Sequence, residues 1–325
     1  MNSYPQVLLL GNGINLLHNM YSWKDVLRKI NVNPHISVDD LTSPMPLQAI
    51  LVTNDNINNI LKDKAKDKNS DINFYGKISS EEQRKQLQKL LCMGFDHILT
   101  TNYSYELELA GLSLQSDISD YQFKKISNHT SAVEKVEPKY MLHSFNQVTY
   151  NDVENKIWHI HGEARKIDSM VLGHYQYGSL FSRIKHELEK TGKEYIKKQE
   201  KDEPIEIQSW MDAFILGDVH ILGFGFDTSE FDLWWLINRK KREKASHGKI
   251  YFYEPIKEDF DERIELLKAL DVEIQNYGIV IPEKLSEDAS ISDQRKRKEE
   301  ISQAYLNFYL CAMDDIKKRI ANEEQ

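Results

Sequence analysis

Short apolar runs recur along the chain, and most of them are separated by stretches whose apolar residues have helical spacing. Runs of about five residues are typical of buried strands, whereas the stretches between them are long enough for helices. This alternation favours an α/β fold, with a Rossmann-like, mostly parallel sheet and helices on both faces. The predicted strands cover residues 6–10, 97–100, 156–161, 219–222, 249–253 and 271–275.

Several helices can be placed from their end signals. Ser22 and Asp25 approximate a capping box for the helix that follows, and Ser79 or Ser80 can cap a helix over residues 81–91. Two further helices are predicted over residues 230–239, which are apolar nearly all round and therefore expected to be buried, and over residues 259–270.

Two long stretches do not fit the simple alternation. Residues 31–95 are polar and rich in asparagine, and residues 176–216 contain strongly charged helical patterns. We interpret both as helical additions around the sheet that are able to cover a cleft. Residues of about 292–320 have apolar positions at helical spacing, which predicts a closing helix. The expected organisation is a single α/β domain over residues 1–325.

Composition and charge narrow the function classes. The chain has 40% hydrophobic and 29% charged residues, as in an ordinary globular protein. It contains 42 basic and 51 acidic residues, a net charge of −9, so we expect no nucleic-acid partner. The basic run over residues 239–244 is interpreted as a solvated helix end.

The sequence also suggests a location. No apolar run reaches the roughly 18 residues that a membrane span requires, and no charged leader precedes the first apolar run. The 2 cysteines, Cys92 and Cys311, are expected to be free thiols. We therefore expect a cytoplasmic protein without a membrane partner.

Glycine turns follow the first and fourth predicted strands, with Gly11, Asn12 and Gly13 in one and Gly223, Gly225 and Asp227 in the other. Glycine lets the backbone turn tightly and approach a pyrophosphate, and amides at a helix start favour anions. Gly-Asn-Gly is also an ordinary tight turn. Two such turns at one sheet edge favour a nucleotide site, and Thr228 or Ser229 is expected to cap the helix after the second.

Polar side chains follow two other strands. Thr101 and Asn102 come after the second strand, where they either face a ligand or cap the next helix. His159 and His161 lie on the third predicted strand, where they are expected to point to the same side. A histidine at a strand end is suited to proton transfer. For His159, the alternative is a structural role without chemistry. A metal would need Glu163 or His174 as further ligands, and none is expected.

Four segments in this order resemble one known pattern. They are residues 11–15 with Ser22 and Trp23, residues 100–103, residues 159–162 and residues 223–227. They resemble the sirtuin-like (silent information regulator) family, and more narrowly its bacterial antiphage branch. Abortive-infection proteins of the AbiH type have a similar Gly-Asn-Gly start and His-x-His-Gly segment. The matching segments span residues 6 to about 240.

The resemblance implies a site for NAD+ as substrate, with no separate cofactor. By that analogy, the first turn lines the dinucleotide with Gly11, Asn12, Gly13 and Asn15. Thr101 and Asn102 face the nicotinamide ribose, and His161 matches the catalytic histidine. The remaining matches are Gly223, Gly225 and Asp227 in the second turn, with Tyr253 and Glu254 near the adenosine.

Departures from the family pattern change the expected reaction. Deacetylating sirtuins carry a zinc module with four cysteines, which a chain with 2 cysteines cannot build. Ser104 stands where the family usually has an aspartate. The expected activity is therefore NAD+ hydrolysis to nicotinamide and ADP-ribose, with Asn102 and His161 as the catalytic pair.

An NAD+ hydrolase that is always active would drain its host. We therefore expect a regulated effector of antiphage defence that forms a homo- or hetero-oligomer and responds to a regulatory protein partner or a nucleotide activator. The alternatives are a nucleotide-binding sensor without catalysis, an AbiH-like toxin and a protein deacylase. Release of nicotinamide from NAD+ separates the first alternative from the expected enzyme.

Overall fold

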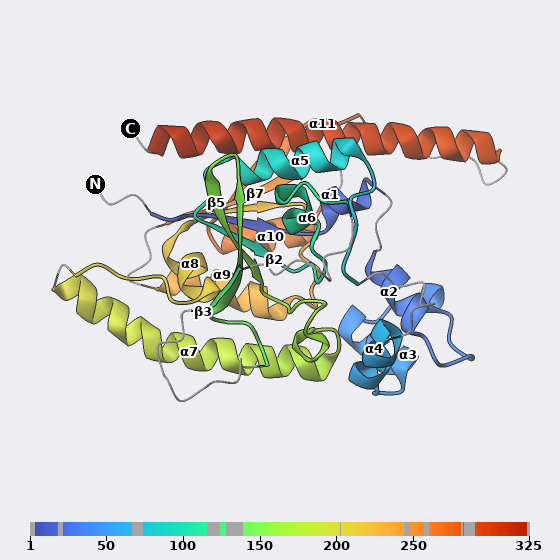
Figure 1. Ribbon diagram of the computed structural model, residues 1–325, viewed down its shortest axis with the longest axis horizontal. Helices are drawn as coiled ribbons and strands as arrows, with labels where there is room; N and C mark the ends of the chain where they lie inside the picture. Colours follow the sequence, from blue (N-terminus) through green and yellow to red (C-terminus); the bar gives the residue numbers. More distant parts are fainter. Residues whose placement is uncertain are drawn as a thin grey trace.

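The structure is a computed structural model that describes residues 4–18, 22–66, 74–115, 124–127, 139–201, 203–243, 248–256, 260–280, 282 and 290–323. One mixed sheet lies between two layers of helices (Figure 1). The predicted α/β class, with a mostly parallel sheet and helices on both faces, is confirmed.

The sheet has eight strands in the order β3-β4-β5-β2-β1-β6-β7-β8. Six neighbouring strands run parallel, and all six were predicted: β5 (Val153–His159), β2 (His97–Thr100), β1 (Gln6–Leu10), β6 (Asp218–Leu222), β7 (Ile250–Pro255) and β8 (Val272–Tyr277). The sequence did not predict β3 (Lys124–Ser127) and β4 (Ser144–Tyr150), which add an antiparallel edge. A two-residue turn joins β4 to β5, with Asn151 and Asp152 at φ values of 48° and 62°.

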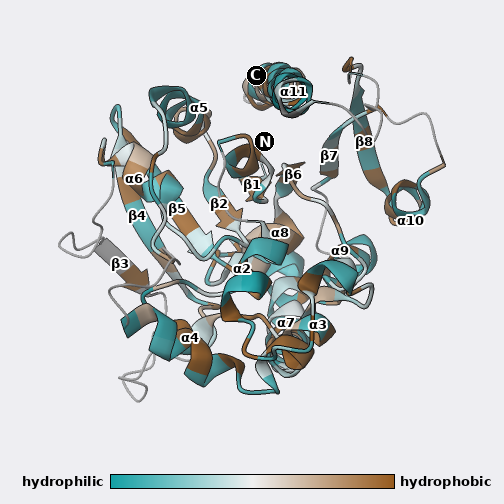
Figure 2. Cartoon of the chain, turned by 90° about the vertical axis from the view of Figure 1, so that its right-hand side faces the viewer, coloured by the Kyte–Doolittle hydropathy of each residue, from teal (hydrophilic) through white to brown (hydrophobic). Residues whose placement is uncertain are grey.

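Alternate residues of each central strand face opposite helical layers. Leu8 and Leu10 of β1 pack in one apolar cluster, whereas Val7 and Leu9 pack in the other. The first cluster includes α5 (Glu81–Leu91), α6 (Glu106–Gly111) and α11 (Ile291–Glu323). The second includes α7 (His174–Glu200), α8 (Trp210–Leu216), α9 (Phe231–Arg242) and α10 (Glu262–Ala269). Figure 2 shows α11 end-on above the sheet and α7 and α8 below it.

The two predicted helical additions are present. The first contains α2 (Trp23–Ile30) at its border, then the short 3-10 helix Val38–Asp40, α3 (Met45–Thr53), α4 (Ile57–Lys66) and α5, although its residues 67–73 lie outside the described residues. The second contains α7 and α8, and a 3-10 turn, Ile167–Ser169, precedes α7. Figure 1 shows α2, α3 and α4 gathered beyond one end of the sheet.

The predicted helix ends are partly correct. Ser22 and Asp25 form a complete capping box, and Ser80 accepts a hydrogen bond from Gln83 N at the start of α5. The predicted cap of α9 is wrong, because the helix begins after Glu230 without a side-chain cap. The predicted start of the next helix, residue 259, lies outside the described residues.

One basic residue departs from the sequence interpretation of a solvated helix end. Lys240 is only 4% exposed, and its Nζ donates hydrogen bonds to the carbonyls of Ile215 at 2.8 Å and Gly217 at 2.6 Å. Burial lowers the pKa of Lys240 to about 7. The last residue of the basic run, residue 244, lies outside the described residues.

The strand order places a switch point between β1 and β6. The chain moves from β1 toward β2 and β5 on one side, and from β6 toward β7 and β8 on the other. In open α/β sheets, ligands bind at the carboxyl ends of the strands at such a point. Both glycine turns lie there, directly after β1 and β6.

Among the described helices, none is both long and apolar enough to cross a bilayer.

The two turns contact each other through their backbones. Gly11 N donates to Leu222 O at 3.0 Å, and a methyl group at Gly11 would overlap the carbonyl of Gly223. Gly11→Ala is therefore expected to lower the free energy of unfolding by about 1–3 kcal/mol, as in other overpacked cores. Chemical denaturation measures this change. Gly225→Ala is the control, because a methyl group there meets open space, and equal unfolding free energies for the two variants would disprove the close-contact explanation.

Candidate functional site

A cavity of about 550 Å³ opens at the switch point. Its volume falls in the range of about 300–1,000 Å³ that is usual for small-molecule sites. The strand ends supply most of the predicted site residues that line it: Asn12, Gly13, Thr101, Asn102, His161, Gly223, Gly225, Asp227 and Glu254. The sequence-based site therefore comes together around one space.

Two predicted residues do not line this cavity. Gly11 is buried behind it, in the contact between the turns. Asn15 is 4% exposed, and its side chain accepts a hydrogen bond from Gln83 of α5 at 3.3 Å. These two residues shape the first turn from behind and have no direct access to a ligand.

Two backbone amides of the first turn are engaged in the contact between the turns. Gly11 N and Gly13 N donate to the carbonyls of Leu222 and Gly223 at 3.0 and 2.9 Å. The helix after the turn, α1 (Gly13–Leu16), has only four residues, so it has little macrodipole. These two amides are therefore not free to bind a phosphate.

Asn102 is free to act on a ligand. The helix-cap alternative is excluded, because α6 begins at Glu106 with Tyr105 as its cap position. Asn102 N donates to Thr100 Oγ1 at 3.1 Å, which fixes the backbone directly after β2. No described residue bonds to the Asn102 amide group, which lines the cavity.

The two histidines face different sides of the sheet, so the expectation that they point together is wrong. β5 ends at His159, and Gly162 takes a φ of 93°, a value that favours glycine. His161 therefore lies in the turn and no longer follows strand alternation. His159 instead bonds to Asn102 O at 2.7 Å and to Glu108 Oε1 at 2.8 Å, a structural role.

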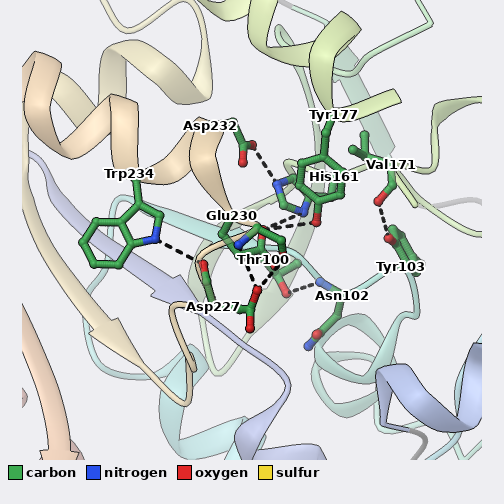
Figure 3. A network of polar contacts seen from close by, with 11 residues as sticks. Thr100, Asn102, Tyr103, His161, Val171, Tyr177, Asp227, Glu230, Asp232 and Trp234 are labelled. Carbon is green, nitrogen blue, oxygen red and sulfur yellow. Dashed lines mark hydrogen bonds and ion pairs between the residues drawn. The ribbon is translucent and has the colours of Figure 1, made fainter. Parts of the chain in front are cut away.

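A chain of polar groups holds His161. Its Nε2 lies 2.9 Å from Asp232 Oδ2, and its Nδ1 lies 3.8 Å from Glu230 Oε2. Tyr177 of α7 donates a hydrogen bond of 3.2 Å to Glu230 and packs edge-on against the imidazole. Figure 3 shows His161 among Tyr177, Glu230 and Asp232, with Asn102 below them. A proton on Nε2 that is donated to Asp232 leaves Nδ1 as the basic nitrogen.

The pKa values of His161 and Glu230 both lie above their ordinary values. Burial opposes protonation of His161, but Asp232 and Glu230 together outweigh it and hold the pKa of His161 above the ordinary 6.5. Burial raises the pKa of Glu230 to about 7, although His161 acts in the opposite direction. A histidine paired with a buried carboxylate is suited to accept a proton during a reaction.

A pair of charged residues lies at the other end of the cavity from His161, beyond the two glycine turns. Glu254 at the end of β7 and Arg263 of α10 both line the cavity and form a close ion pair. Arg263 also donates to Gly225 O at 2.6 Å and to Asp261 at 3.0 Å. The hydroxyl of the neighbouring Tyr253 is hydrogen-bonded to the buried His220, so Tyr253 contributes its ring to the cavity wall.

Several functional residues were not predicted from the sequence. Residues 230–239 were predicted to be apolar nearly all round, although Glu230 lines the cavity and Asp232 is fully buried beside His161. Glu106 also lines the cavity, two residues after the departure at Ser104, and the two side chains bond at 2.5 Å. The sequence signal that could have located Glu230 is a carboxylate at the start of an otherwise apolar helix.

The cluster of His161, Glu230 and Asp232 is the one place among the described residues where three ligand atoms lie within 4.8 Å of one another, as a metal ion requires. The predicted His-x-His ligand pair does not form, since both ring nitrogens of His159 are engaged. The contact between His161 and Asp232 has hydrogen-bond geometry, and a metal ion would have to replace that bond. The same hydrogen bond also makes the cluster suited to proton transfer.

Comparisons with known proteins leave the family open. No protein-family model matches the chain, and no curated protein matches it significantly. The resemblance of the four segments to sirtuin-like proteins thus stays a prediction.

Proposed function

We propose that the chain is an NAD+ glycohydrolase, which cleaves the bond between nicotinamide and ribose to give nicotinamide and ADP-ribose. The observation that carries the proposal is the meeting of Asn102 and a carboxylate-held His161 in one cavity with both glycine turns. The sirtuin-like resemblance of the same four segments supports it independently of this geometry.

The order of the strand ends supports a dinucleotide that lies across the sheet edge. The cavity passes from His161 and Asn102, after β5 and β2, through the turns after β1 and β6, to Glu254 at the end of β7. From β2 to β7 this is three strand spacings, roughly 14 Å. An extended dinucleotide fits with its nicotinamide ribose at Asn102, its diphosphate at the turns and its adenosine at Glu254.

The reaction needs little acid catalysis. When the bond breaks, its electron pair leaves with nicotinamide and neutralises the pyridinium, so that an oxocarbenium-like ribose remains. Water adds to the anomeric carbon and releases one proton. Asn102 orients the water or a ribose hydroxyl, and His161 Nδ1 accepts the proton.

The acidic residues at this end of the cavity favour a cationic transition state. Glu230 lines the cavity beside His161, and Asp232 lies directly behind the imidazole. Negative groups aimed at a position where positive charge develops lower the barrier most in a water-poor site. The same carboxylates would oppose a reaction that builds an oxyanion at this position.

The adenosine end gives a prediction about substrate choice. If the adenosine ribose lies at Glu254, this carboxylate accepts a bond from the 2′-hydroxyl and repels a 2′-phosphate, and its partner Arg263 offsets part of that repulsion. NAD+ is therefore expected to be preferred over NADP+ by about tenfold, because like-charge contacts are costly and the offset is partial. Glu254→Gln is expected to remove most of this preference, as measured by kcat/KM for the two dinucleotides.

Asp261→Asn is the matched control for that experiment. Asp261 also pairs with Arg263, but it does not line the cavity. Its replacement is expected to leave the preference unchanged. A wild-type enzyme that accepts both dinucleotides equally would exclude adenosine binding at Glu254.

The biological setting follows from the resemblance alone. We propose a regulated effector of antiphage defence, which a protein partner or a nucleotide activates. The direct test of the chemistry is nicotinamide release from NAD+, measured by chromatography, with and without candidate activators.

A further inference from the structure

The C-terminal helix contributes to the cavity wall. Three aromatic residues of α11 line it: Tyr305, Phe308 and Tyr309. The sequence predicts only that this helix closes the fold. In Figure 2, α11 lies above β1, β6 and β7. Its three aromatic residues line the same cavity as the glycine turns.

The Tyr309 hydroxyl lies at both turns. A methyl group on Gly13 would overlap this hydroxyl, and one on Gly223 would lie 3.4 Å from it. Tyr309 is only 5% exposed, and its ring packs against Phe308 with a centroid distance of 4.8 Å. The hydroxyl is thus held in place beside both glycine turns.

This hydroxyl has no partner within the part of the chain that the structure describes. No hydrogen bond joins it to any described residue, although Tyr309 is more than nine-tenths buried. Burial also raises the pKa of Tyr309 above its ordinary value, so the group stays a hydrogen-bond donor. Tyr309 lines the cavity, so a ligand or water there can accept a hydrogen bond from this hydroxyl.

Several other donors near the turns are already engaged. The amides of Gly11 and Gly13 donate to backbone carbonyls. Arg263 is the only lysine or arginine among the described lining residues, and its guanidinium bonds to Glu254 and Gly225. A diphosphate at the turns would therefore find the Tyr309 hydroxyl as an unengaged donor.

We propose that Tyr309 donates a hydrogen bond to the diphosphate of the bound nucleotide, which makes α11 part of the binding site. The identity of the ligand as a dinucleotide rests on the proposed function. The position of the donor rests only on the contacts of Tyr309 with the two turns.

The experiment compares the binding of ADP and adenosine by calorimetry to wild-type protein and Tyr309→Phe. The variant keeps the ring and removes only the hydroxyl. ADP affinity is expected to fall roughly 10- to 100-fold, as for the loss of a bond to a charged group, while adenosine affinity stays within about twofold.

Tyr277→Phe is the matched control. The Tyr277 hydroxyl also contacts α11, through a 3.0 Å bond to Asp315, but Tyr277 does not line the cavity. Its removal is expected to leave ADP affinity unchanged. A specific loss in Tyr309→Phe alone supports the proposal.

Three outcomes would overturn the proposal: unchanged ADP affinity in Tyr309→Phe, an equal loss for ADP and adenosine, or no ADP binding by the wild-type protein. Its failure is separable from that of the proposed function. If the protein cleaves NAD+ but binds ADP equally well without the Tyr309 hydroxyl, only the diphosphate contact is wrong. If ADP binding depends on Tyr309 but NAD+ is not cleaved, only the hydrolase proposal is wrong.

Discussion

Nicotinamide release from NAD+ is expected to fall about 100- to 10,000-fold when His161 is replaced by alanine, because the reaction loses its general base. Asn102→Ala is expected to cost about 100-fold or more, since water or ribose is no longer oriented. Both rates are measured as kcat/KM by chromatography of the released nicotinamide. Loss of activity in both variants would fit their shared position in the cavity.

Stability controls are needed for only one of these variants. His161 is 2% exposed, and its removal leaves Asp232 buried without its partner, so unfolding must be measured alongside activity. Asn102 is partly exposed, and its amide group bonds to no described residue, so Asn102→Ala is expected to fold normally. His186→Ala, at an exposed position of α7, is the control for a histidine outside the cavity.

Asp232→Asn is expected to lower kcat/KM about 100-fold or more at neutral pH, because the side chain that fixes the tautomer of His161 loses its charge. The pH profile adds a second readout. His161 must be unprotonated to accept a proton, so activity rises with pH through its pKa. A carboxylate stabilises the imidazolium, and its removal lowers that pKa. The acidic limb of the profile is therefore expected to move to lower pH in the variant.

Glu243→Gln is the control for this shift. Glu243 is a buried carboxylate at the end of the same helix, where it pairs with Arg239 away from the cavity. Its variant is expected to keep the wild-type limb. An acidic limb at the same pH in Asp232→Asn and wild type would rule out His161 as the titrating base.

The strand ends were the most predictable part of the molecule. Buried parallel strands are continuous apolar runs, and residues 6–10 and 97–100 were predicted with the observed bounds. Since each run ends at a glycine or a polar cluster, nine of the eleven predicted site residues line the cavity. β4 was missed because Asn146 and Gln147 interrupt its apolar pattern, although Asn151-Asp152 is a usable turn signal.

The polar partners of the site were less predictable. Asp232 lies 71 residues from His161 in sequence, and only the packing of α9 against the turn after β5 joins them. Periodicity also cannot show that a chain leaves its strand early, as it does before His161. The role proposed for Tyr309 was also not predictable, because the apolar pattern of its helix predicts packing alone.

The most direct test mixes excess purified protein with NAD+ and follows nicotinamide over time for wild type and Asn102→Ala. Nicotinamide formation by the wild type at a rate well above that of the variant is the predicted result. Equal rates in the two proteins, with both correctly folded, would contradict the assignment of this cavity to NAD+ cleavage.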